Sequence, residues 1–178
     1  PRPLRVIGAG AAGLEVVLAL RRRWPLRPLQ LQHHPGQLDA TTRKSLQRAR
    51  ITLIDDDVPP SGPSLLCTGS QGPAWLARAG LPVDSDGRVR TDRCLRVEGY
   101  PSLFASGDCA VISTAPRPAS GVWAVRAGRP LATNLEAACR GRPLRPWQPQ
   151  RQALQLIGSQ QDAAWARWGD WRLGPSSL

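Results

Sequence analysis

Apolar and polar positions alternate along the first third of the chain in a way that predicts strands and helices in turn. The predicted elements, in chain order, are a strand over residues 4–8, a helix over 11–23, a strand over 28–34, a helix over 39–49 and a strand over 50–54. Pro25 should end the first helix, and Asp39 is the expected N-cap of the second. This order is a β-α-β-α-β unit, half of a Rossmann fold with a parallel sheet.

The rest of the chain follows an acidic, proline-rich junction at residues 55–64. Its predicted elements are a strand over 65–69, a helix over 73–81, strands over 87–92 and 102–108 and a long helix over 120–141. Ser120 is the expected N-cap of the long helix, Gly141 is its expected C′ residue, and Pro130 inside it predicts a kink. The tail from Pro143 onward is rich in Pro, Gln, Arg and Trp. The fold class expected for the whole chain is α/β.

Composition and charge narrow the class of protein. The 178 residues are 41% hydrophobic and 21% charged, with a mean hydropathy of −0.31, which is typical of a soluble globular chain. No run approaches the roughly 18 apolar residues of a membrane span, and no signal-peptide pattern opens the sequence. The net charge of +11 comes almost entirely from arginines spread along the chain, so we expect a solvated surface and no nucleic-acid partner. The one tight cluster, RRR at 21–23, ends a predicted helix, where cations suit the helix dipole.

The cysteines and histidines indicate neither a metal site nor a redox disulfide. The four cysteines lie far apart without a CxxC pair, and the two histidines are adjacent. Reduced thiols in a cytoplasmic protein are therefore expected. Methionine is absent, and the chain opens on Pro-Arg-Pro directly before its first motif, which favours a fragment of a longer protein.

A glycine motif joins the first predicted strand to the first predicted helix. Gly8, Gly10 and Gly13 form G-x-G-x-x-G, with Ala11 and Ala12 between the last two glycines. The first glycine permits a tight turn, the second admits a pyrophosphate close to the backbone, and the third lets helix and strand pack closely. Free N–H groups at the helix N-terminus then hold the phosphate. All five residues are candidate cofactor-binding residues.

The acid that usually completes this motif is missing from its expected position. An Asp or Glu about 20 residues further on binds the adenosine ribose in NAD-binding folds. Gln32, His33 and His34 occupy that position here. The two histidines leave two alternatives. One of them hydrogen-bonds the ribose or weakly favours a 2′-phosphate, or both are a plain pair of surface residues.

Several stretches resemble two-dinucleotide flavoproteins, and most of all their type II NADH dehydrogenase-like group. "GAGAAGLE" resembles the NAD(P)H-binding motif of these proteins, and "LLCTG" resembles the strand that closes their NAD domain. "GRVRTDRCLRVEGYPSLFASGDCA" and "PRPASGVWAVRAGRPLATNL" are similar to their second FAD motif and to the helix that faces the flavin. The tail "AAWARWGDWRLG" resembles the flavoprotein module fused to selenide, water dikinase.

This resemblance implies the cofactors FAD and NAD(P)H and adds candidate site residues. Residues 1–69 would form a reduced NAD(P)H-binding Rossmann unit, and residues 70–178 the C-terminal portion of an FAD-binding domain with a Trp-rich tail. The N-terminal FAD motif and the meander of strands before residue 65 are missing from the pattern. The cofactor-binding residues that the resemblance adds are Glu15 near the nicotinamide, Gly69 at the domain junction, Gly107 and Asp108 at the flavin chain, and Gly121 and Val122 at the flavin ring.

The expected function is an FAD-dependent NAD(P)H oxidoreductase that passes hydride to the flavin and on to a quinone or another small acceptor. No side chain is identified as an acid–base catalyst. The alternative is a non-catalytic nucleotide-binding or partner module, associated with a selenophosphate-forming domain. Trp165, Trp168 and Trp171 predict either an interfacial helix in peripheral contact with the inner face of a membrane or, preferably, packing on another domain or subunit.

Overall fold

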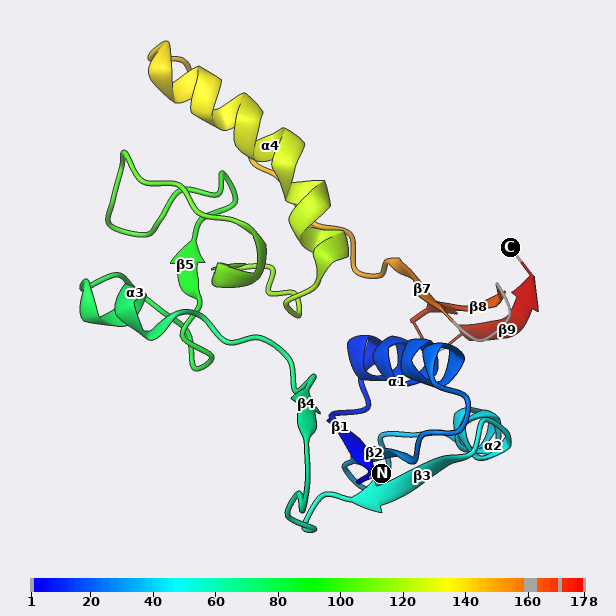
Figure 1. Cartoon of the computed structure of the whole chain (residues 1–178). Helices are drawn as coiled ribbons and strands as arrows, with labels where there is room; N and C mark the ends of the chain where they lie inside the picture. Colours follow the sequence, from blue (N-terminus) through cyan, green and yellow to red (C-terminus); the bar gives the residue numbers. More distant parts are fainter. Residues whose placement is uncertain (1, 159–162, 170, 178) are drawn as a thin grey trace. The chain divides into compact units, whose positions relative to one another are not determined.

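The computed structural model describes residues 2–158, 163–169 and 171–177, which form two units (Figure 1). The first unit comprises Pro1–Gly69 together with Leu154–Leu178, and the second comprises Ser70–Ala153. The tail thus clusters with the N-terminal residues, whereas the sequence grouped it with the residues from 70 onward.

The first unit is built on a four-stranded parallel sheet in the order β3-β2-β1-β4. Its strands are β1 (Leu4–Ile7), β2 (Leu29–His33), β3 (Ile51–Asp55) and β4 (Ser64–Leu66). Helices α1 (Ala11–Arg23) and α2 (Ala40–Arg48) connect β1 to β2 and β2 to β3. The predicted β-α-β-α-β unit is confirmed, and β4 adds to the free edge of β1. Residues 56–63, all of them described, contain no strand, so β3 leads directly to β4.

The core of this unit lies between the sheet and its helices. The core includes Val6 and Leu31, from adjacent strands, and Val17 of α1, and all three are completely inaccessible to solvent. Full burial of such a side chain stabilises the folded state by about 1.5–3 kcal/mol. The N-cap expected for α2 is confirmed, because the Asp39 carboxylate accepts a hydrogen bond of 2.7 Å from the backbone N–H of Thr42.

The tail forms a three-stranded antiparallel sheet of β7 (Leu154–Gly158), β8 (Ala163–Trp168) and β9 (Trp171–Ser177). The expected possibility of a helix is therefore wrong. In a strand, residues three apart lie on opposite faces, so Trp165 and Trp168 point in opposite directions. Ile157 and Trp165 pack into the core with α1, and the Gly158 N–H donates to the Glu15 carboxylate at 2.9 Å. Of the three tryptophans, Trp165 therefore packs on another part of the chain, as the sequence favoured, whereas Trp168 and Trp171 are exposed.

The second unit contains short elements around a long helix. They are α3 (Ala74–Arg78), β5 (Val89–Thr91), β6 (Ala110–Ile112) and α4 (Gly121–Cys139). Strands β5 and β6 pair in parallel. The strand expected over 102–108 is wrong: Gly107–Cys109 is a 3-10 turn, and β6 begins only at Ala110. Gly107 has φ +78°, which ends any extended run.

Helix α4 ties the second unit together. It continues through Pro130 and ends before Gly141, whose φ of +63° confirms the expected C′ residue. Asn134 on this helix is completely buried. Its amide nitrogen donates to the carbonyls of Cys94 and Arg145, both at 2.9 Å, and its oxygen accepts from the Arg145 N–H at 2.8 Å. One side chain thereby fixes two loops against α4.

Candidate functional site

The glycine turn between β1 and α1 depends on two glycines for its close packing. Gly8 has φ +103°, and a Cβ there would lie closer than 3.0 Å to the backbone of Cys67, just after β4. A Cβ on Gly13 would lie closer than 3.0 Å to the carbonyl oxygen of Gly8. The first turn of α1 therefore rests directly on the strand end, as dinucleotide-binding turns require.

The rest of the turn is open to a ligand. Gly10, Ala11 and Ala12 are exposed, and a Cβ on Gly10 would meet nothing within 4 Å. Gly10 is the N-cap of α1, with no side-chain cap and no acidic residue in the first turn. The first N–H groups of a helix have no partner within the helix. They offer an anion a positive, uncovered end.

The end of β2 lies next to this turn, because the Gly8 N–H donates to the Gln32 carbonyl at 3.0 Å. The Gln32 amide is engaged: its nitrogen donates to the Asp56 carbonyl at 2.9 Å, and its oxygen accepts from Arg5 at 3.3 Å. The His33 ring is buried and bonded to the His34 carbonyl through Nδ1 at 2.9 Å. His34 is the exposed member of the three.

Two further predicted site residues of the first unit have structural surroundings of their own. Glu15 is exposed on α1 and binds the backbone of Gly158 in β7, so its carboxylate holds the tail sheet to the helix. Gly69 ends the N-terminal segment of the first unit, with φ +97°, and a Cβ there would meet nothing within 4 Å. A glycine is needed at this position for the backbone conformation and not for close packing.

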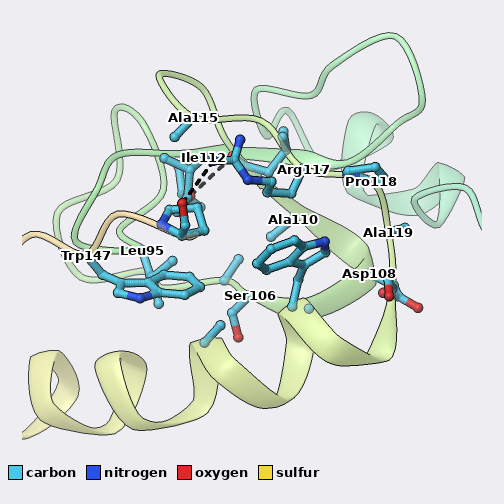
Figure 2. A pocket seen from close by; sticks show the side chains of 18 residues that line it. Leu95, Ser106, Asp108, Ala110, Ile112, Ala115, Arg117, Pro118, Ala119 and Trp147 are labelled. Atoms are coloured by element: carbon cyan, nitrogen blue, oxygen red, sulfur yellow. Dashed lines mark hydrogen bonds between the residues drawn. The ribbon is translucent and has the colours of Figure 1, made fainter. Parts of the chain in front are cut away.

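The second unit contains a largely apolar pocket beside α4 (Figure 2). Trp147 and Leu95 lie at one end of this pocket and Asp108 at the other. The pocket brings the predicted residues Gly107 and Asp108 together with Ser120, the N-cap of α4. The other two residues predicted for this site are Gly121 and Val122. They are adjacent on the first turn of α4 but do not line the pocket.

Sequence reasoning missed the aromatic side chains of this pocket. The Trp123 ring is flanked by the guanidinium groups of Arg117 at 5.8 Å and Arg126 at 5.7 Å. Arg117 also donates to the carbonyls of Pro149, at 2.9 Å, and Gln150, at 2.8 Å. It thereby fixes the proline-rich segment that carries the pocket's second tryptophan. The contacts of Arg117 with residues 149 and 150 join parts of the chain that are more than 30 positions apart, so no local motif predicts this arrangement.

Two groups with displaced pKa values lie outside the candidate residues. Burial raises the pKa of the Cys94 thiol, and the nearby Asp92 carboxylate raises it further. Burial also opposes ionisation of Asp84, but hydrogen bonds and charge from Arg88 outweigh this and lower the pKa of Asp84. In the described part of the chain, no three potential metal-ligating side chains gather at one place.

Solved structures define the class of fold to which the chain is similar. The water-forming NADH oxidase of Lactobacillus brevis bound to NADH has a TM-score of 0.70 and 19% identity, over 93% of this chain and 42% of that one. A reduced Bacillus anthracis CoADR-RHD has a TM-score of 0.70 and 20% identity, over 95% of this chain and 34% of that one. The predicted α/β class is confirmed, with a Rossmann-like parallel sheet.

Two curated relatives bear one name, ferroptosis suppressor protein 1. The Taeniopygia guttata protein is 24% identical over 180 residues, and the Xenopus tropicalis protein 22% over 181 residues. Each match covers 81% of this chain and 48% of the relative, so the chain spans about half the length of the curated relatives it matches. Neither is a selenide, water dikinase, so these relatives give the predicted selenophosphate association no support. No protein-family model matches the chain.

Proposed function

We propose that this chain supplies the NAD(P)H site and part of the FAD site of an oxidoreductase that passes hydride from NAD(P)H to flavin. The observation that carries the proposal is the glycine turn, in which Gly8 and Gly13 allow close packing while Gly10 leaves the helix end open. Support comes from the similarity of fold to an NADH oxidase bound to NADH.

The residues of the turn fit a dinucleotide pyrophosphate. Gly8 and Gly13 bring the start of α1, whose first N–H groups have no partner within the helix, close to the strand ends. Gly10 has no side chain to stand in the way of the phosphates. Ala11 and Ala12 provide N–H donors with small, exposed side chains. The chain's own role here is to bind the anion and to orient the nucleotide.

The pocket of the second unit fits the proposed role of holding part of a flavin. Asp108 is exposed at its rim, where the carboxylate can accept hydrogen bonds from hydroxyl groups of a bound chain. Gly121 and Val122 begin α4, whose positive end favours negative charge on a neighbouring ring. Bound flavin would supply the redox chemistry, whereas the protein orients it and sets its electrostatics.

The flavin assignment is tested by substitution of Asp108. We expect Asp108→Ala to weaken FAD binding by about tenfold or more, because a charge-assisted hydrogen bond is lost. FAD affinity is measured by quenching of flavin fluorescence on titration with the purified protein. Asp86→Ala, which removes an exposed carboxylate from a different loop of the same unit, is the matched control. Equal FAD affinity of the Asp108 variant and the wild type would contradict the assignment.

The proposal has two further parts. The flavin passes its electrons to a quinone or another small acceptor, and the protein makes a peripheral contact with a membrane. One face of the tail sheet supports the membrane contact: paired residues of its three strands leave an exposed apolar patch made of Leu154, Leu156, Trp168, Trp171 and Leu173. Tryptophan is favoured at membrane interfaces, and the net charge of +11 favours anionic lipid. No helix in the described residues has the length and apolarity to cross a bilayer.

The membrane contact predicts a selective effect of Trp171, whose side chain is 79% exposed. We expect Trp171→Ser to lower the fraction of protein that sediments with phosphatidylglycerol-containing vesicles several-fold, because an interfacial anchor is removed. Trp75→Ser, at a 59% exposed tryptophan of the second unit, is expected to sediment like the wild type. If both variants behave alike, the patch is not the contact surface.

A further inference from the structure

The residue that recognises the adenosine ribose is not evident at the end of β2. The Gln32 amide is engaged on both of its atoms, and His33 is only 3% exposed. The His34 side chain, by contrast, is 71% exposed. Because Gly8 is hydrogen-bonded to Gln32, His34 leaves the sheet at the same edge as the glycine turn. His34 and the residue that it contacts are therefore the candidates for binding the ribose near the glycine turn.

The contact of His34 is a carboxylate from a different strand. Its Nδ1 lies 2.6 Å from Oδ2 of Asp56, the residue directly after β3. The backbone of Asp56 is held as well, because its carbonyl accepts from the Gln32 amide at 2.9 Å. His33 and Asp55 are partners in the register of β2 and β3, so the two strands end level with each other. Asp56 is thus fixed beside the end of β2 by both its backbone and its side chain.

We propose that Asp56, positioned by His34, accepts the hydrogen bonds of the adenosine ribose and that the site takes NADH in preference to NADPH. This inference rests on the proposed dinucleotide function of the glycine turn. The Asp56 side chain is 40% exposed, so its carboxylate is open to ribose hydroxyls while it faces His34. A carboxylate accepts from the hydroxyls of a ribose diol, which is the role of the missing acid.

The charges around Asp56 disfavour a 2′-phosphate. Asp55 and Asp57 flank it, and both are exposed. A phosphate at the 2′ position would bring negative charge against these carboxylates. The arginine nearest in this network, Arg5, is already engaged: its guanidinium donates to the Val58 carbonyl at 2.7 Å and to the Gln32 amide oxygen at 3.3 Å. The site therefore suits a ribose with free hydroxyls.

The test is the affinity of the purified protein for NADH and for NADPH, measured by the fluorescence of the reduced nicotinamide. We expect the wild type to bind NADH about tenfold or more tightly than NADPH. Asp56→Asn should weaken NADH binding about tenfold and leave NADPH binding unchanged or tighter. His34→Ala should weaken NADH binding by a smaller factor, because it removes only the positioning contact. Asp57→Asn, which removes the same charge one residue away, should change NADH affinity less than twofold.

The outcomes separate this inference from the function on which it rests. Unchanged NADH affinity in Asp56→Asn, or equal weakening of both dinucleotides, would overturn the role of Asp56. So would a wild type that binds NADPH as tightly as NADH. If the wild type binds neither dinucleotide, the proposed function fails and the inference fails with it. Thermal melting of each variant confirms that the compared proteins are folded.

Discussion

Gly13→Ala is expected to destabilise the first unit by about 3 kcal/mol or more, because the new methyl group would strike backbone. Its Cβ would lie closer than 3.0 Å to the carbonyl oxygen of Gly8, an atom that cannot rotate away. Alanine is favoured over glycine inside a helix by about 1 kcal/mol, so the clash must exceed this gain. Thermal unfolding followed by circular dichroism measures the loss.

Gly10→Ala is the matched control for this substitution. A Cβ at Gly10 meets nothing within 4 Å, and its φ of −70° suits alanine. Stability should therefore change by less than about 0.5 kcal/mol. NADH affinity should nevertheless fall, because the methyl group stands where the pyrophosphate approaches. A Gly13 variant as stable as the Gly10 variant would contradict the packing derived for the turn.

Arg21→Met is expected to cost about 3–5 kcal/mol of stability, because a buried set of hydrogen bonds loses its donor. Arg21 is 8% exposed, and its guanidinium donates to four carbonyls around the end of α1. These are the carbonyls of Trp24, Pro25, Arg27 and Arg50, at 3.4, 2.8, 2.9 and 2.6 Å. The measurement is chemical denaturation in urea.

A neighbour in the same helical turn provides the comparison. Arg23 is exposed, so Arg23→Met should alter stability by less than about 0.5 kcal/mol. Arg21→Lys should also destabilise, since an ammonium has three donors and lacks the planar fork of arginine. If Arg21→Met and Arg23→Met unfold at the same urea concentration, the buried guanidinium does not hold the end of α1.

The parallel sheet and the glycine turn could be predicted from sequence because their signals are local. Apolar residues at strand and helix spacing, with glycines at fixed offsets, decide both. The RRR cluster at 21–23 is an example of a feature that local patterns do not predict. The sequence assigns the three arginines only a favourable interaction with the helix dipole, whereas Arg21 turns inward to carbonyls as distant as that of Arg50. Only the folded chain brings those acceptors together.

Two other regions depend on contacts that the linear pattern does not carry. The extended run expected over 102–108 breaks because the backbone turns at Gly107. The tryptophans of the tail were compatible with a helix or with packing, and cross-strand pairing with β7 and β9 selects a sheet. Asp56 was read as part of a junction, since the acid of this motif is sought about 20 residues after the glycines and not at the next strand.

The function proposed for this chain is a part in hydride transfer from NAD(P)H to flavin. The most direct test is an anaerobic absorbance spectrum of the purified protein between about 300 and 550 nm, with FAD supplied and NADH added afterwards. We expect flavin bands that remain with the protein after gel filtration and bleach when NADH is added. A protein that stays colourless after incubation with FAD, or a bound flavin that NADH does not bleach, would contradict it.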